Sequence, residues 1–385
     1  MKTKALARAI ERYQEEYHDV SPLVREIGGW TAAAGDSQLW RINPFALAEE
    51  LGVERKPLLE GFLTLASQGF FDLNWDFHCT ECNAVAGTHR HLRDATASNH
   101  CPLCDVDFRN DLIHNVEVTF TPSASYYTVS KRFIDAQTAQ TVALHKSKEI
   151  RLPRVYVRGI DCLHVALFRE LFESETLSLR ESMRIGQVCI MFTDIKGSTA
   201  LYDRLGDSAA YGLVRVHFEI LFEKIAVFDG VIVKTIGDSV MASFRHPSDG
   251  VGAALAIQRS FTELNERKTL RNEILVKIGL HSGATIMVNL NNRIDYFGQS
   301  VNMAARIQNS AEGGEVVISE TVRRDSASIA ALRGQVSSLT KREVALKGIS
   351  ESQSIYRLNF AIPISGRGRT SVGGVRQTVA AGQHQ

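Results

Sequence analysis

Hydrophobic and polar residues alternate most regularly in the second half of the chain. Short apolar runs predict strands, and apolar residues spaced three and four apart predict amphipathic helices between them. Helices are expected from Asp207 to Gly230, from about Ser248, and over 301–309. The expected strands cover residues 188–192, 231–236, 239–244, 274–280, 285–290 and 315–319. This β-α-β-β-α-β order predicts an α+β domain at 185–360, a ferredoxin-like split βαβ sheet with its helices on one face.

The first half has weaker signals. Asn43 can cap a helix that Gly52 ends, and a second helix would end near Gly69. Residues 71–78 then alternate like a strand. Helix, turn, helix and strand give a winged-helix-like outline over about 40–77. Its basic residues are balanced by acids, so we expect a structural or regulatory role in place of DNA binding.

The remaining segments are simpler. Residues 1–120 are expected to form an N-terminal regulatory region, followed by a connector with a helix at 121–184. Residues 361–385 are rich in glycine and arginine without any acid, which predicts a disordered tail.

Composition narrows the class of protein. The chain has 385 residues, of which 44% are hydrophobic and 23% charged, as in an ordinary globular protein of two or three domains. The net charge of +1 argues against a nucleic-acid binder. No apolar run approaches the roughly 18 residues that cross a bilayer. The first residues do not resemble a secretion signal. We therefore expect a cytoplasmic protein without a membrane anchor.

Four of the six cysteines lie in one short window. Cys79 and Cys82 form one C-x-x-C pair, and Cys101 and Cys104 form a second. Two such pairs can complete a tetrahedron of thiolates around Zn²⁺ with no open position, so the sequence predicts a structural, zinc-ribbon-like module over about 77–110. Nearby histidines could replace one ligand: His78, His89, His91 and His100. Cys162 and Cys189 are expected to be buried thiols in a reducing compartment.

Two acids stand at the ends of adjacent predicted strands. Asp194 follows the strand at 188–192, and Asp238 occupies the hairpin turn between the next two strands. Two neighbouring carboxylates repel each other unless cations lie between them, and an oxygen-lined pair suits Mg²⁺. The adjacent loop from Lys196 to Thr199 offers backbone N–H groups to a polyphosphate. Each acid alone would be an ordinary cap or turn residue.

Three separated motifs occur in one order. They are Phe192-Thr-Asp-Ile-Lys-Gly-Ser-Thr199, Lys234-Thr-Ile-Gly-Asp238 and Asp295-Tyr-Phe-Gly-Gln-Ser-Val-Asn-Met-Ala-Ala-Arg306. Together they resemble the class III nucleotidyl cyclases, which convert ATP or GTP to the 3′,5′-cyclic nucleotide. The resemblance covers about residues 185–359. It implies a ferredoxin-like catalytic domain that works as a homodimer with two Mg²⁺ or Mn²⁺ ions per site.

The resemblance also implies roles for single residues. Asp194, Asp238 and the backbone carbonyl of Ile195 would bind the two metal ions. Lys234 and Asp295 would recognise the base. Asn302 would orient the ribose and Arg306 would stabilise the transition state.

Two further positions carry less information. Lys347 is the best candidate for a late lysine that binds the triphosphate, and Lys341 is the alternative. His281 is expected to be structural.

The function predicted from these residues is an adenylyl cyclase that makes cyclic AMP and pyrophosphate from ATP. An unknown ligand or protein partner would regulate it through the N-terminal region. Guanylyl cyclase is the alternative within the same class. A non-catalytic signalling protein that binds nucleotide or a partner is the alternative from another class, and the intact acids argue against it.

Overall fold

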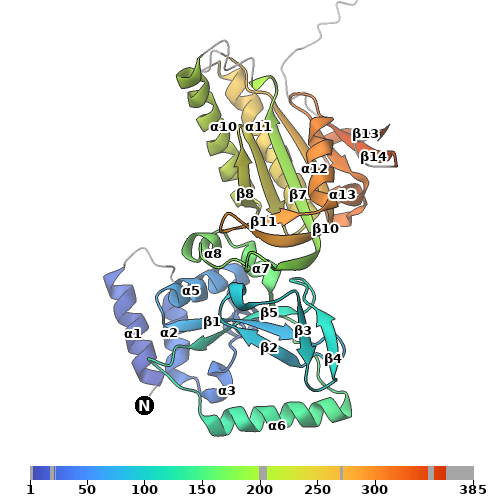
Figure 1. Cartoon of the computed structure of the whole chain (residues 1–385). Coiled ribbons are helices and arrows are strands. Elements are labelled where there is room, and N and C mark those ends of the chain that lie inside the picture. Colours follow the sequence, from blue (N-terminus) through green and yellow to red (C-terminus); the bar gives the residue numbers. More distant parts are fainter. Residues whose placement is uncertain are drawn as a thin grey trace, which may run out of the picture.

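The chain folds into two halves stacked end to end, as the computed structural model shows (Figure 1). The structure describes residues 3–17, 21, 23–198, 206–268, 272–345 and 351–360. The expected disordered tail at 361–385 and Lys347 lie outside the described residues.

Five helices open the N-terminal half. Asn43 caps α4 as predicted, because its side-chain oxygen accepts from the N–H groups of Phe45 and Ala46. Gly52 ends that helix with φ of 68°, in the left-handed region that glycine adopts without strain. The helices are α1 (Thr3–Glu16), α2 (Leu23–Ala33), α3 (Asp36–Leu39), α4 (Pro44–Leu51) and α5 (Arg55–Ser67).

The N-terminal sheet has four antiparallel strands in the order β2-β1-β5-β6. Its members are β1 (Phe71–His78), β2 (Val85–His89), β5 (Val116–Pro122) and β6 (Val157–Arg158). The predicted helices and strand are present, but the winged-helix-like description is not confirmed. In this sheet β1 lies between β2 and β5, and Phe71 pairs with Pro122 across a long stretch of sequence.

A small hairpin stands beside this sheet. A 3₁₀ turn at Leu92–Asp94 precedes β3 (Ser98–Cys101), which pairs with β4 (Val106–Arg109). This hairpin and the end of β1 carry the four clustered cysteines. The zinc-ribbon-like description is not confirmed beyond that cluster.

Residues 123–171 link the two halves. Helix α6 (Lys131–Ser147) has no buried residue. The chain then returns to the N-terminal sheet as β6 and forms two short helices, α7 (Gly159–Leu163) and α8 (Ala166–Leu171), which lie between the halves (Figure 1). Phe168 of α8 is fully buried and packs edge-on against Trp75 of β1, with 6.0 Å between ring centroids.

The C-terminal half is built on a sheet with the order β13-β14-β12-β10-β7-β9-β8. The strands predicted at 231–236 and 239–244 are confirmed, whereas those at 274–280 and 285–290 are one strand, β10, with a register shift between Gly283 and Thr285. The strands are β7 (Ser182–Ile195), β8 (Val231–Ile236), β9 (Ser239–Phe244), β10 (Val276–Leu290), β11 (Arg293–Phe297, paired with β10), β12 (Val316–Ser319), β13 (Val336–Val344) and β14 (Gln353–Phe360).

Helices cover both faces of this sheet, so the prediction that they share one face was wrong. α10 (Asp207–Val227) and α11 (Pro247–Glu266) pack on one face, and α12 (Gln299–Asn309) packs on the other. Gly279 of β10 explains this arrangement, because a Cβ there would lie 2.2 Å from the backbone nitrogen of Gln308 in α12. Short helices α13 (Glu320–Arg324) and α14 (Ser326–Leu332) follow β12.

One continuous hydrophobic core joins the two halves. It includes Trp75 and Phe168 from the N-terminal half and Ile190, Met241 and Tyr296 from the C-terminal sheet. All five side chains are at most 2% exposed. The halves therefore pack through apolar side chains and are not joined by a linker alone.

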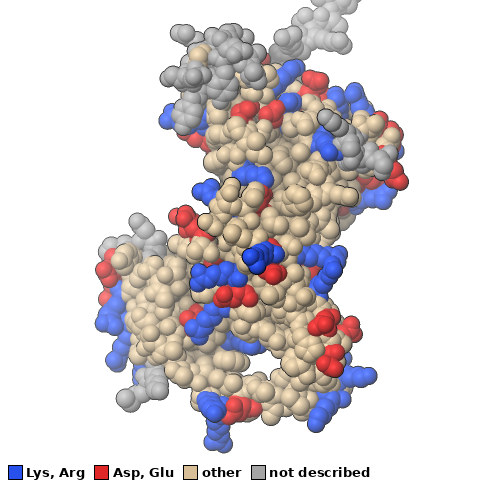
Figure 2. Space-filling view, viewed as in Figure 1, with Lys and Arg blue, Asp and Glu red and all other residues tan. Residues whose placement is uncertain are grey.

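Among the described residues, no helix combines the length and apolar character needed to span a membrane. Acidic and basic side chains are interspersed on the face shown in Figure 2, in keeping with the near-zero net charge.

Candidate functional sites

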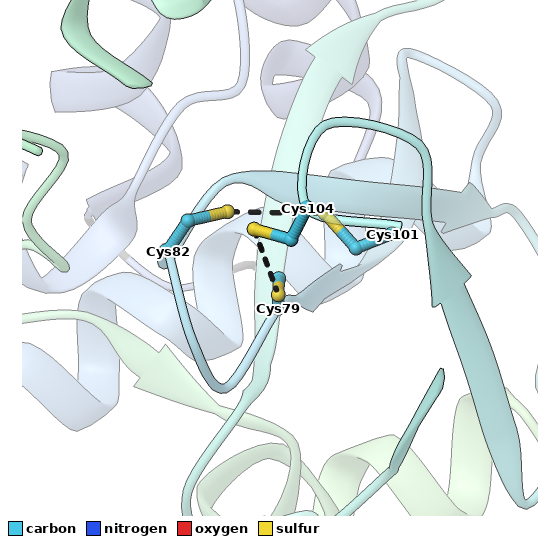
Figure 3. Close-up of side chains that lie close together, drawn as sticks. All are labelled: Cys79, Cys82, Cys101 and Cys104. Carbon is cyan, nitrogen blue, oxygen red and sulfur yellow. Dashed lines mark hydrogen bonds between the residues drawn. The ribbon is translucent and has the colours of Figure 1, made fainter. Parts of the chain in front are cut away.

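The four clustered thiols converge on one point (Figure 3). The Sγ atoms of Cys79, Cys82, Cys101 and Cys104 all lie within 4.8 Å of one another. Cys79 and Cys104 are 4.0 Å apart, and Cys82 and Cys101 are 3.8 Å apart. All four cysteines are free, so this is a set of thiols and not a pair of disulfides.

Two matching turns create this arrangement. The N–H of Asn83 donates to the carbonyl of Cys79, and the N–H of Asp105 donates to the carbonyl of Cys101. The donor–acceptor distance is 2.9 Å in both. Asn83 and Asp105 both have positive φ, 61° and 56°, which bends the chain back after the second cysteine of each pair. The turns therefore aim both thiols of each C-x-x-C motif at the same point.

The expected histidine substitutes lie elsewhere. His78 contacts Glu117 at 2.8 Å and His100 contacts Asp107 at 3.0 Å. Instead, Nε2 of His145 in α6 lies 3.4 Å from Sγ of Cys104. The sequence analysis missed His145, which is 41 residues from Cys104.

The loop after the first C-x-x-C motif also contacts the segment that leads into β7. One oxygen of the buried Glu175 carboxylate lies 2.5 Å from Nδ1 of His91, and the other accepts from the N–H of Leu92 at 2.8 Å. Glu181 accepts from the N–H of Ala97 at 2.9 Å. The thiol-bearing region is therefore fixed to the start of the C-terminal sheet.

The two predicted metal-binding acids lie together at one end of that sheet. Asp194 is near the end of β7, and Asp238 is in the turn between β8 and β9. Ser239 Oγ donates to Asp194 Oδ1 at 2.7 Å, and the N–H of Ile195 donates to Asp238 Oδ2 at 3.1 Å. Each acid is thus held by the residue that follows the other.

Two neighbours of these acids were not singled out from the sequence. Lys277 of β10 pairs in register with Asp194, and its Nζ lies 2.8 Å from Asp194 Oδ2. Burial lowers the pKa of His217 in α10 to about 4. Its imidazole is therefore neutral near pH 7, and Nε2–H can donate to the carbonyl of Asp238 at 3.1 Å. The β7–β10 register is the signal that could have found Lys277.

The predicted phosphate loop is described in part. The N–H of Lys196 donates to the carbonyl of Leu275 at 2.8 Å, so it is already engaged. Gly197 has φ of 70°, and Thr199 lies outside the described residues.

The predicted base-recognition residues contact each other. Lys234 Nζ on β8 lies 2.5 Å from Asp295 Oδ2 on β11. The other oxygen of Asp295 accepts from the N–H of Tyr296 at 2.8 Å, which fixes the carboxylate. The Asp295 side chain is 9% exposed and that of Lys234 is 35% exposed.

Asn302 and Arg306 lie one turn apart on α12, on the sheet face that also carries Asp194. Asn302 is exposed and Arg306 is half-buried. Within the described ranges, neither side chain forms a hydrogen bond or an ion pair. Both polar groups are therefore available to a ligand.

The other predicted positions are less informative. The exposed Lys341 of β13 pairs with Glu343 at 2.8 Å. Burial lowers the pKa of His281 to about 4, and the structural role expected for it stays a prediction.

Two family models match the chain. Residues 181–359 match the model described as "Adenylate and Guanylate cyclase catalytic domain". Residues 15–162 match one described as "Family of unknown function (DUF5939)".

Individual proteins are similar to the C-terminal half. An adenylate cyclase of Mycosarcoma maydis is 31% identical over 160 residues, which are 37% of this chain and 6% of that protein. An adenylate cyclase of Lachancea kluyveri is 30% identical over 153 residues, 35% of this chain and 8% of that protein. The chain thus spans less than a tenth of the length of these relatives. The solved structure of the adenylyl cyclase CyaB from P. aeruginosa is 23% identical and covers 48% of this chain and 100% of that one, with a TM-score of 0.40.

Proposed function

Residues 181–359 belong to the adenylate and guanylate cyclase catalytic-domain family, and from this premise we propose that the chain is an adenylyl cyclase. It would convert ATP to 3′,5′-cyclic AMP and pyrophosphate. The observation that carries the choice of ATP is the contact between Lys234 and Asp295. The acids Asp194 and Asp238, held side by side, support catalysis.

The base preference follows from hydrogen-bond chemistry. Adenine presents a donor, its amino group at C6, next to an acceptor, N1. Asp295 offers an acceptor and Lys234 offers a donor, and the two groups already lie side by side. Guanine reverses both partners, so Asp295 would face a carbonyl oxygen and Lys234 an N–H group. Buried polar groups left without partners disfavour the wrong base.

The donor set at Asp194 and Asp238 fits hard divalent cations. Two carboxylates and the backbone carbonyl of Ile195 would hold Mg²⁺ or Mn²⁺, which prefer oxygen ligands. When bound, such ions supply activation of the ribose 3′-hydroxyl and charge neutralisation of the triphosphate. The ammonium of Lys277, 2.8 Å from Asp194, adds positive charge beside this donor set.

The remaining residues would act on the reacting atoms. The ribose 3′-hydroxyl gives up its proton to solvent and its oxygen forms a bond to the α-phosphorus. The bond from that phosphorus to the bridging oxygen breaks, and pyrophosphate leaves. Asn302 would orient the ribose. Arg306 would place positive charge on the phosphorane oxygens, where negative charge develops. Lys347, or else Lys341, would bind the triphosphate.

We further propose that the site is shared between two copies of the chain. Asn302 and Arg306 point to no partner among the described residues, whereas the acids are held within the chain by Ser239 and Ile195. In a symmetric dimer, the acids of one copy would face Asn302 and Arg306 of the other. Each dimer would then contain two composite sites.

The thiol cluster supports a structural zinc site. Four sulfurs within 4.8 Å match the donor set of a closed tetrahedral site, which leaves no position for substrate. We expect zinc to stabilise the N-terminal region. An unidentified ligand or protein would bind that region and regulate the cyclase half. Free thiols and an ATP substrate both suit a cytoplasmic location.

Product analysis tests the proposed activity directly. Purified full-length protein is incubated with ATP or GTP in Mg²⁺ or Mn²⁺, and cyclic nucleotides are separated by chromatography. We expect cyclic AMP to dominate. Formation of cyclic GMP alone would favour the guanylyl alternative, and an absence of both products would contradict a cyclase.

A further inference from the structure

We propose that Arg169 of α8 is a positioning residue for base recognition, through which the N-terminal half sets nucleotide preference. This inference rests on the proposed function, because it concerns the pair Lys234 and Asp295. It adds a residue outside the cyclase domain to that site.

Arg169 bridges three elements with one guanidinium group. Its Nε donates to the carbonyl of Leu163 in α7 at 3.3 Å. Its Nη1 donates to the carbonyl of Ile232 in β8 at 3.4 Å, and its Nη2 donates to the hydroxyl of Tyr296 in β11 at 3.4 Å. The planar, forked guanidinium can hold several acceptors in a fixed relative position, which an ammonium cannot do.

The two strands that Arg169 contacts are those that carry the base-recognition pair. Ile232 is two residues before Lys234 on β8, and Tyr296 directly follows Asp295 on β11. Among the described strands, β8 pairs with β9 and β11 pairs with β10, so no backbone ladder joins β8 to β11. Side chains bridge the two strands directly, and among these bridges are the Lys234–Asp295 contact and the Arg169 contacts.

Local backbone structure makes β8 sensitive to this bridge. It is the last strand of the sheet, and its register against β9 shifts between Ile232 and Lys234. Such a bulge redirects the side chains that follow it. Holding the carbonyl of Ile232 thus constrains the direction in which Lys234 leaves the strand.

Arg169 is itself anchored in the N-terminal half. Its neighbour Phe168 is fully buried, packs on Trp75 of β1 and belongs to the core shared by the two halves. A movement of α8 would therefore change the distance between β8 and β11 and with it the geometry of Lys234 and Asp295.

The test compares variants of the full-length chain. Arg169→Ala removes the whole bridge, and Tyr296→Phe removes a single acceptor with little risk to folding. Arg245→Ala is the matched control, because Arg245 also crosses between the halves, to Asp161 at 3.1 Å, without touching β8 or β11. Affinity is measured with 3′-deoxy-ATP and 3′-deoxy-GTP, which cannot cyclise, alongside KM and kcat for ATP and GTP.

We expect Arg169→Ala to lower the ratio of ATP-analogue to GTP-analogue affinity about tenfold and Tyr296→Phe to lower it about threefold. Arg245→Ala should stay within about twofold of the wild type. The affinity ratio and KM should change more than kcat.

If the wild type is an active adenylyl cyclase, either of two results would overturn the inference. In the first, Arg169→Ala and Tyr296→Phe both keep the wild-type ratio of ATP-analogue to GTP-analogue affinity. In the second, Arg245→Ala lowers that ratio as much as Arg169→Ala does. A wild-type protein that makes no cyclic nucleotide would instead overturn the proposed function.

Discussion

The two candidate sites differ in how complete they are within one chain. The cluster of Cys79, Cys82, Cys101 and Cys104 is closed, since all four sulfurs converge within 4.8 Å. The cyclase site is open, since Asn302 and Arg306 have no side-chain partner among the described residues. A closed donor set suits a structural ion, whereas unpartnered polar groups suit a substrate and a second subunit.

The largest effect is expected at the closed site. Cys101→Ser should abolish stoichiometric zinc binding, because it removes one of the four thiolate ligands. The effect should be large, since structural zinc contributes about 10 kcal/mol or more of binding free energy. Zinc content is measured by mass spectrometry, and hydrogen exchange should show faster exchange over residues 75–110. Cys162→Ala is the matched control, since Cys162 is buried away from the cluster and its loss should leave zinc bound. A structural zinc site would be contradicted if the purified wild type held no zinc and residues 75–110 exchanged as slowly in the wild type as in Cys101→Ser.

The residues of the open site should be divisible between the two chains of a dimer. Asp194→Ala and Arg306→Ala should each lower kcat about a hundredfold to a thousandfold. Mixing the two inactive chains should restore up to about a quarter of wild-type activity, because half of the dimers are mixed and each contains one whole site. The measurement is cyclic AMP formation after co-expression. Mixed dimers that form and remain inactive would contradict a shared site.

Nucleotide preference should depend on the Lys234–Asp295 pair. Combining Lys234→Glu with Asp295→Cys should lower the ATP-to-GTP ratio of kcat/KM by about a hundredfold, because the pair would no longer match adenine. The double variant of Glu49 and Arg55 to alanine is the control, since that exposed ion pair lies on α4 and α5, away from the cyclase site. Equal turnover of both nucleotides by the wild type would show the assignment to be wrong.

A smaller effect is expected on the stability of the protein in acid, through His164. Burial, with a smaller contribution from nearby Arg169 and Arg245, lowers the pKa of His164 to about 3. This folded-state pKa is below the unfolded value, so its contribution to stability is present above pH 6.5 and is lost as the pH falls toward 3. Between pH 7 and 5, the unfolding free energy should decrease by about 2 kcal/mol on this account.

His164→Asn removes this titration while keeping a polar donor near the carbonyl of Ile160, which Nδ1 of His164 contacts at 2.9 Å. Chemical denaturation at both pH values should show a smaller pH dependence for the variant. An unchanged pH dependence would contradict a neutral, buried His164.

Local patterns in the sequence predicted individual elements in both halves. The strands at 231–236 and 239–244 and the cap at Asn43 follow from alternation and side-chain chemistry, which act over a few residues. Spacing predicted the grouping of the four cysteines. The expected position of the first strand beside the hairpin predicted that Asp194 lies near Asp238.

Contacts between distant segments could not be predicted in this way. The pairing of β1 with β5, the contact of His145 with Cys104, and the ion pair of Lys277 with Asp194 depend on register and packing. The close approach of α12 to the second sheet face requires Gly279, which in the sequence is only one residue of the strand predicted at 274–280. Such information enters when the chain has folded back on itself.

The apolar core that runs through both halves has a consequence for modular engineering. Side chains of the N-terminal half and Phe168 of α8 shield Ile190, Met241 and Tyr296 from solvent. A C-terminal half separated from the N-terminal half would expose these apolar side chains, which favours aggregation. A chimera should therefore keep α7 and α8 with the cyclase sheet and place its fusion point before them. That fusion point would lie upstream of residue 181, where the match to the cyclase family begins.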